Sequence, residues 1–228
     1  SCNRNRVKLQ LAALYEVIKE QHIAYCTPPS SFGDAGQRVR LSDNVLSGKL
    51  GTCLDLSLLY ASCAEAMGLH PLLVIIQGHA FVGCWLIDGT FPDAVNDDPS
   101  LLTKRTADGI NEVILLEATC MTDGNNVTFD TAVGLANDKM LAVNDFTCFI
   151  DVARSRFAHI LPLPQRVMHG KAWTVSPEVA QIPKGGLYIS PVSAPEEIKQ
   201  YDLDNQDSYV EFTKQLLWER KLLDLSIR

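Results

Sequence analysis

The 228-residue sequence has no Cys-x-x-Cys pair, although it contains seven cysteines. This absence excludes the usual patterns of zinc ribbons and thioredoxin-type redox sites. Four of the cysteines lie in apolar runs, where a free thiol acts as a small buried hydrophobe: Cys63, Cys84, Cys120 and Cys148. Free thiols of this kind are typical of a reducing compartment, so we expect a cytoplasmic protein.

The sequence also lacks an excess of basic residues. Its 20 Lys and Arg against 27 Asp and Glu give a net charge of −7, which argues against direct binding to nucleic acid. No signal peptide and no apolar run of transmembrane length is present, so we expect no membrane association. No P-loop, Rossmann fingerprint or calcium-loop spacing occurs, and the sequence therefore predicts no cofactor and no metal.

The residues that are present form both helical and strand patterns. The sequence predicts helices over Val7–Gln21, Cys53–Met67 and Phe129–Ala142. It predicts strands over Pro71–Gln77, His79–Ile87, Glu112–Cys120 and Phe146–Ala153. Residues 33–51 are polar and irregular in pattern, and residues 88–111 form a long acidic excursion with turn residues.

Composition divides the chain into three parts. We expect residues 1–164 to form the main domain, and residues 165–202 to be a proline-rich linker or extended segment. Residues 203–228 resume a helical pattern, which we expect to lead into a further domain. The chain starts without methionine and stops inside that pattern, so we interpret it as a piece of a longer protein.

The stretch Gly51-Thr52-Cys53 places a thiol at the start of an almost wholly apolar helix. The positive end of the helix dipole stabilises a thiolate, which is the nucleophilic form of cysteine. We expect Gly51 to leave room for a substrate carbonyl, and the backbone N–H of Cys53 to donate to a developing oxyanion. A cysteine followed by leucines also fits a buried core thiol, so the interpretation depends on its partners.

His79 is the candidate base, because it opens a strand that follows the Cys53 helix and one intervening strand. A base of this kind needs an acceptor for its second ring nitrogen. Glu117 interrupts the apolar run Val113–Leu116, where an unpaired buried carboxylate would cost several kcal/mol. The sequence therefore predicts that Cys53, His79 and Glu117 meet in space as a catalytic triad.

The pattern Gly51-Thr52-Cys53-x-Asp55, followed by Gly78-His79-Ala80-Phe81-Val82, resembles the transglutaminase-like branch of the papain-like cysteine peptidase superfamily. The resemblance covers roughly residues 7–164. It implies an α+β, papain/transglutaminase-like core in which a buried catalytic helix packs on an antiparallel sheet. Cys53 would be the nucleophile and His79 the base. Glu117, in Glu117-Ala118-Thr119, stands at the acid position, where the family usually has Asp. Asp88 is the alternative acid.

The sequence is most similar to a version of this domain in large bacterial helicase-like proteins, some of them linked to anti-phage defence. The segments 36–41 and 218–226 carry this closer resemblance. It implies a cysteine peptidase whose partners are a protein or peptide substrate and the helicase-like domains of its own chain. Three alternatives remain: a transglutaminase, a glutamine deamidase with the same triad, or a non-catalytic sensor or docking module.

Three further residues are candidates for the site. Gln37 is the glutamine upstream of Cys53, in the place where papain-like enzymes use a glutamine amide to complete the oxyanion hole; a solvated loop glutamine is the alternative. Trp85 and Tyr60 could line a substrate cleft, but their apolar neighbours make packing in the core the safer interpretation.

Overall fold

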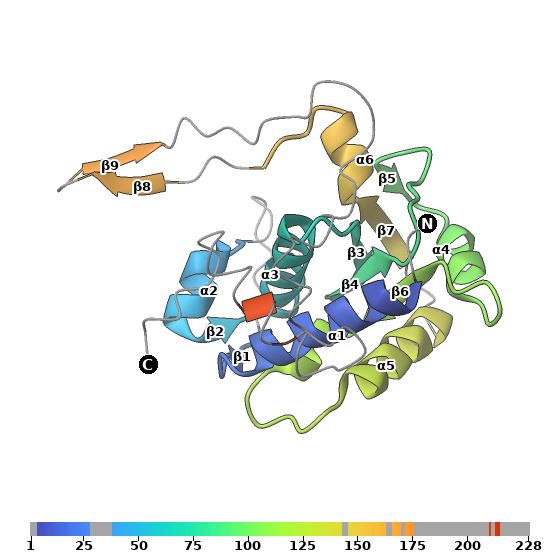
Figure 1. Cartoon of the computed structure of the whole chain (residues 1–228), viewed down its shortest axis with the longest axis horizontal. Helices are drawn as coiled ribbons and strands as arrows, with labels where there is room; N and C mark the ends of the chain where they lie inside the picture. The colour runs from blue at the N-terminus through green and yellow to red at the C-terminus, as the bar shows by residue number, and fades with distance from the viewer. Residues whose placement is uncertain are drawn as a thin grey trace.

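The computed structural model describes residues 4–27, 38–142, 146–162, 166–169, 172–175, 210, 213 and 214. Its helices are α1 (Arg4–Lys19), α2 (Ser42–Gly48), α3 (Cys53–Ala66), α4 (Pro99–Thr106), α5 (Phe129–Ala142) and α6 (Val152–Phe157), with a 3₁₀ turn η1 (Ala118–Met121). Its strands are β1 (Ala24–Tyr25), β2 (Leu50–Gly51), β3 (Pro71–Ile76), β4 (His79–Trp85), β5 (Val95–Asn96), β6 (Val113–Leu116), β7 (Phe146–Asp151), β8 (Arg166–His169) and β9 (Ala172–Val175). The described chain is therefore a mixed helix-and-sheet protein, as the sequence predicted (Figure 1).

A five-stranded antiparallel sheet with the order β5-β7-β3-β4-β6 organises the fold. Strands β3 and β4 form a hairpin in which Ile76 pairs with His79. The two-residue turn between them contains Gly78 at φ 71°, a left-handed conformation that glycine adopts without steric cost. This tight turn places His79 at the first position of β4.

The sheet separates two apolar cores, because successive side chains of a strand point to opposite faces. On β4, Val82 and Cys84 pack into the core that contains α1 and α3. Phe81 and Trp85, which alternate with them, pack into the second core together with α4 and the C-terminal half of α5. Helix α5 runs along the edge strand β6 and contributes to both cores.

Helix α3 lies within the first core and is buried on nearly all sides, as its apolar composition predicted. It begins with a capping box: the Thr52 hydroxyl accepts from the Asp55 N–H at 3.2 Å, and the Asp55 carboxylate accepts from the Thr52 N–H at 3.0 Å. Gly68, at φ 80°, follows its C-terminus. Because Thr52 is the N-cap, Cys53 is the first residue of the helix.

Two predicted segments were wrong in part. The strand predicted over Glu112–Cys120 covers only Val113–Leu116, because the Glu117 carboxylate accepts the Thr119 N–H at 3.1 Å and begins the turn η1. Such side-chain contacts to the local backbone compete with strand pairing. The segment 33–51, predicted to be irregular, contains helix α2, which ends at Lys49 in a left-handed conformation.

The C-terminal third is described only in short stretches. In the predicted linker, β8 and β9 form an antiparallel pair that lies to one side of the body (Figure 1). Of the predicted helix over residues 203–228, Val210 packs against the first core, and Lys214 lies 2.7 Å from Glu20. The remaining residues of both predictions lie outside the described part. None of the described helices has the length and apolar character needed to cross a lipid bilayer.

Candidate active site

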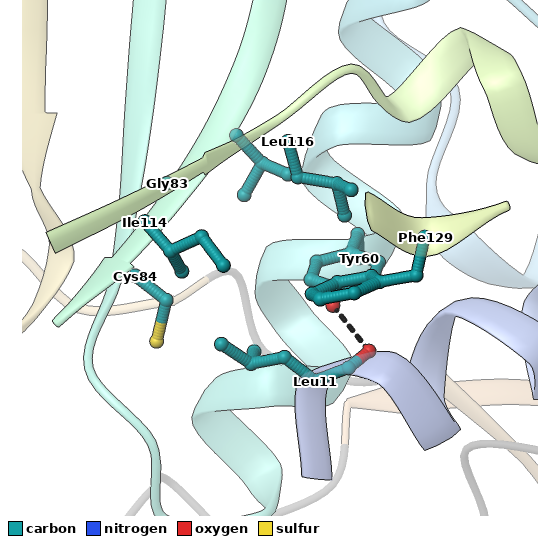
Figure 2. A pocket seen from close by; sticks show the side chains of 8 residues that line it. Leu11, Tyr60, Gly83, Cys84, Ile114, Leu116 and Phe129 are labelled. Atoms are coloured by element: carbon teal, nitrogen blue, oxygen red, sulfur yellow. Dashed lines mark hydrogen bonds between the residues drawn. The ribbon is translucent and has the colours of Figure 1, made fainter. Parts of the chain in front are cut away.

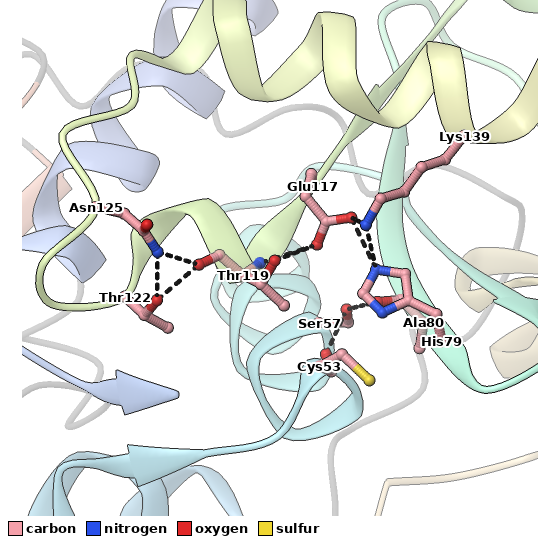
Figure 3. A network of polar contacts seen from close by, with 9 residues as sticks. All are labelled: Cys53, Ser57, His79, Ala80, Glu117, Thr119, Thr122, Asn125 and Lys139. Carbon is pink, nitrogen blue, oxygen red and sulfur yellow. Dashed lines mark hydrogen bonds and ion pairs between the residues drawn. The ribbon is translucent and has the colours of Figure 1, made fainter. Parts of the chain in front are cut away.

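Cys53, His79 and Glu117 come from three separate elements and meet in one polar array (Figure 3). Nε2 of His79 lies 2.7 Å from Oε2 of Glu117. The Cys53 side chain lies beside the other edge of the imidazole ring, away from Glu117 (Figure 3), and the two groups shift each other's pKa. Because Nε2 is engaged by the carboxylate, Nδ1 is the ring nitrogen that serves the thiol.

A buried serine fixes the distance between the elements that carry Cys53 and His79. The Ser57 hydroxyl donates to the Cys53 carbonyl at 2.8 Å and is also 3.3 Å from the Ala80 carbonyl. Ser57 belongs to the first turns of α3, and Ala80 directly follows His79 on β4. The start of the helix and the start of the strand are therefore linked through one fully buried hydroxyl.

The Glu117 carboxylate is 2% exposed and accepts four hydrogen bonds. Oε1 accepts from the Thr119 N–H at 3.1 Å and from its hydroxyl at 2.7 Å, while Oε2 accepts from His79 at 2.7 Å and from Nζ of Lys139 at 2.6 Å. These bonds fill the roughly four acceptor sites of a carboxylate. Burial raises the pKa of Glu117, but the hydrogen bonds to His79, Lys139 and Thr119 outweigh it and bring the pKa to about 2.

The alternative acid, Asp88, does not lie beside His79. It follows the far end of β4, a strand of seven residues that spans about 20 Å. Glu117 is thus the carboxylate that the fold brings to the imidazole.

Hydrogen bonds shift the pKa values of the thiol and the imidazole in opposite directions. Hydrogen bonding to Cys53 and then to Glu117 raises the pKa of His79 to about 9, against the opposing effects of burial and of the Lys139 charge. Burial raises the pKa of Cys53, yet bonds to the His79 side chain and to the backbone of Ala80 and Leu54 hold it below its ordinary value. Both shifts are in the direction that favours a thiolate–imidazolium pair over the neutral pair.

Asp55 holds the segment upstream of α2 against the start of α3, which the sequence analysis did not foresee. Its side chain is fully buried and accepts from the Arg40 N–H at 2.8 Å and from the Arg40 guanidinium at 3.0 Å, besides closing the capping box. These bonds keep the pKa of Asp55 low although burial raises it. The Thr52-x-x-Asp55 spacing is a capping-box signal that could have been read from the sequence.

Tyr25 was also missed, and it lies near the Cys53 thiol: burial and then the charge of Cys53 raise the pKa of the Tyr25 hydroxyl. Strand β1 pairs in parallel with β2, so that Tyr25 lies opposite Gly51, two residues before Cys53. A two-residue strand has no periodicity from which this contact could be predicted. The Tyr25 side chain is accessible, since the residue is 41% exposed, and it adds a second polar group beside the thiol.

Gly51 has a different role from the one expected. A Cβ atom added to it would lie 3.3 Å from Cγ of Leu56 and 3.4 Å from Cγ1 of Val45. The glycine therefore allows α2 and α3 to pack closely beneath the strand, rather than leaving room for a substrate.

Tyr60 and Trp85, the candidates for lining a cleft, are both buried in the core instead. The Tyr60 hydroxyl donates to the Leu11 carbonyl at 2.7 Å, and its ring borders a small internal cavity of about 10 Å³ (Figure 2). Such a volume holds about one water molecule, so it is not a substrate site. The indole N–H of Trp85 donates to Asp151 at 3.2 Å, on the face of the sheet opposite to α3.

Gln37, the oxyanion candidate, lies outside the described residues. Within the described stretches, no group of three or more His, Cys, Asp or Glu side chains is placed to hold a metal ion. The arrangement that the fold does provide is a thiol, an imidazole and a buried carboxylate in sequence, which are the three groups that a cysteine nucleophile, its base and an orienting acid require.

Comparisons with known proteins give no match, either to a family model, to a curated protein or to a solved structure. We therefore take the geometry of the site, together with the sequence motifs, as the basis for its function.

Proposed function

We propose that the chain carries a cysteine-nucleophile acyl-transfer enzyme, and that it hydrolyses peptide or isopeptide bonds with Cys53, His79 and Glu117. The observation that carries this proposal is the order of the three groups: the Cys53 thiol lies beside His79, and Nε2 of His79 lies 2.7 Å from Oε2 of Glu117. A buried helix that begins at the proposed nucleophile packs on an antiparallel sheet whose strand β4 begins at the proposed base, which agrees with the papain/transglutaminase-like core implied by the sequence.

In the first half of the reaction, the Cys53 thiolate attacks the carbonyl carbon of the substrate. The carbonyl oxygen becomes an oxyanion near the N-terminus of α3, where the first backbone N–H groups have no intrahelical partner. His79 donates its Nδ1 proton to the amine nitrogen, the C–N bond breaks, and an acyl-thioester remains on Cys53.

In the second half, neutral His79 takes a proton from a water molecule through Nδ1, and the water oxygen attacks the thioester carbonyl. The C–S bond breaks, the acid product leaves, and the thiolate–imidazolium pair is restored. Glu117 stays ionised throughout because its four donors hold it so, and it keeps the imidazole oriented and stabilises its positive charge.

We further propose that this enzyme acts in the cytoplasm as a module of a larger, helicase-like bacterial protein, with a protein or peptide as substrate. The sequence segments on either side of the core support this context. Transglutamination and deamidation use the same thioester and differ in the substrate carbonyl or in the acceptor that resolves it. They are therefore alternative outcomes of the experiments below.

The activated thiol can be tested without a substrate. We expect iodoacetamide to label Cys53 well below pH ~8.5, where an ordinary thiol is still protonated. Cys63, on the same helix, is an internal control because burial raises its pKa to about 12. Peptide-resolved mass spectrometry should show Cys53 labelled first, and His79→Ala should slow that labelling. If Cys53 reacts no faster than Cys63, the nucleophile assignment fails and the non-catalytic module is favoured.

The reaction class is then read from products. Wild type and Cys53→Ala are incubated with a peptide library that contains glutamine, with and without a primary amine. Cleaved peptides that depend on Cys53 support the peptidase. The mass gain of deamidation, or an amine-linked product, would assign one of the alternative classes instead.

A further inference from the structure

Lys139 brings a second positive charge to the proposed catalytic array. Its Nζ donates to Oε2 of Glu117 at 2.6 Å and lies 3.1 Å from Nε2 of His79 (Figure 3). The ammonium group, the carboxylate oxygen and the imidazole nitrogen therefore form a closed triangle. A nucleophile, a base and an orienting acid do not require such a cation, so its presence needs a separate explanation.

The packing of α5 determines the position of Lys139. The Glu117 N–H donates to the Ala132 carbonyl at 3.2 Å, which ties the helix to the end of β6. Ala132, Ala136 and Met140 form the buried face of α5, and Lys139 lies three residues after Ala136 on the same side. The helix thus directs the lysine at the carboxylate, although the lysine side chain is 41% exposed.

His79 and Lys139 share one oxygen atom. Two cations at 3.1 Å repel each other, and the arrangement is stable because the negative charge of Oε2 lies against both. The titratable groups that the described elements bring to this array are Cys53 from α3, Tyr25 from β1, Glu117 after β6, Cys120 from η1 and Lys139 from α5. Of these, Lys139 is the group whose charge opposes the protonated imidazole.

We propose that Lys139 is a positioning residue that fixes the Glu117 carboxylate and, by sharing its Oε2, makes His79 release its proton more readily to the leaving amine. Without Lys139, Oε2 of the carboxylate would accept from His79 alone, and the imidazolium would hold its proton more tightly. The thiolate would remain, but protonation of the leaving group would be harder. This role rests on the proposed function, while the electrostatic coupling between Lys139 and His79 can be measured without it.

The test compares Lys139→Met, which keeps the length of the side chain without its charge, with Lys139→Arg, which keeps the charge. The control is Lys8→Met. Lys8, on α1, lies 2.8 Å from Asp130, which belongs to α5, the helix that carries Lys139, and Lys8 is about as exposed as Lys139. The ring protons of His79 are assigned with His79→Gln and titrated by NMR in each variant. Thermal unfolding shows whether each variant is folded, and Lys139→Gln replaces Lys139→Met if the latter is not.

In Lys139→Met, we expect the pH at which His79 loses its proton to rise by about one unit, a tenfold change in its protonation equilibrium. Lys139→Arg and Lys8→Met should stay close to wild type. With an active substrate, the alkaline limb of kcat/KM should move upward by the same amount, which a merely structural role of Lys139 would not produce. An unchanged or lowered midpoint in both folded Lys139→Met and Lys139→Gln would overturn the inference.

The two proposals fail in different ways. If iodoacetamide does not label Cys53 ahead of Cys63 in wild type, the proposed enzyme is wrong, whatever the NMR titration of His79 shows. If Cys53 is activated in wild type but the His79 midpoint does not respond to Lys139, the enzyme stands and the role of Lys139 is refuted.

Discussion

Replacing Glu117 by Gln tests how much free energy the buried carboxylate contributes, and at which pH. The pKa of Glu117 is about 2 in the folded protein, against an ordinary value of 4.5. A carboxylate with a lowered pKa stabilises the folded state at a pH above its unfolded pKa, and this contribution is lost as the pH falls through the folded pKa. The expected contribution is about 3 kcal/mol at neutral pH, about half of that near pH 3, and almost none near pH 2.

The glutamine variant keeps the shape of the side chain but cannot accept from all four donors. We therefore expect Glu117→Gln to lower the free energy of unfolding by about 3 kcal/mol at neutral pH, with a smaller loss in acid. His79 stays protonated over this acidic range because its pKa is about 9, so the change is assigned to the carboxylate. Urea unfolding of wild type and variant at about pH 7, 4 and 3 measures the difference directly.

A suitable control is Asp130→Asn, which removes a carboxylate from an exposed ion pair with Lys8. Exposed pairs of this kind contribute at most about 1 kcal/mol, so the control should differ little from wild type at any of the three pH values. The reasoning is refuted if Glu117→Gln loses the same free energy near pH 3 as near pH 7. A loss below about 1 kcal/mol at neutral pH would contradict the four-bond arrangement as well.

Three further substitutions probe other parts of the site. Asp55→Asn should destabilise the protein by about 2 kcal/mol or more in urea unfolding, because an amide nitrogen would face the donors of Thr52 and Arg40; a neutral effect would contradict this. Tyr25→Phe should slow the alkylation of Cys53 near neutral pH several-fold without loss of stability, and an unchanged rate would show that the hydroxyl does not assist the thiolate. Gln37→Ala should lower kcat by about one to three orders of magnitude if its amide donates to the oxyanion, whereas unchanged turnover would remove it from the site.

The parts of the site that the sequence predicted are those with a local signal. Cys53 is preceded by a capping threonine and followed by an apolar helix, and His79 follows a glycine turn between two apolar strands. Each pattern is specified by residues within about fifteen positions of one another, so it depends little on tertiary contacts. Glu117 was identified because a carboxylate is unusual among apolar neighbours. The strand that contains it was predicted to be too long, because the Glu117 side chain bonds to the Thr119 N–H and ends the strand.

The residues that were missed take their positions from tertiary packing. From the sequence, Lys139 is an ordinary basic residue in the last turn of a helix, where its positive charge interacts favourably with the negative end of the helix dipole. Its contact with Glu117 depends on α5 lying along β6, and the amphipathic pattern of α5 does not specify which strand it covers. Trp85 packs in the core, as its apolar neighbours favoured, but the sequence alone did not decide on which face: only the pairing of β4 determines that its indole points away from α3.

The order of charges explains how this fold can accommodate ionised groups where water is largely excluded. In its thiolate–imidazolium form, the array alternates in sign from Cys53 through His79 and Glu117 to Lys139. Each charge thus has an opposite neighbour, and the array as a whole is neutral, so the cost of burying the inner charges is offset by their mutual attraction. Exposure rises from the buried carboxylate to the half-exposed lysine, which lets water screen the outer cation and not the inner pair. A three-group array would carry a net negative charge at the same place. The lysine therefore balances the charge of the array at Oε2 of Glu117, the oxygen atom that it shares with His79.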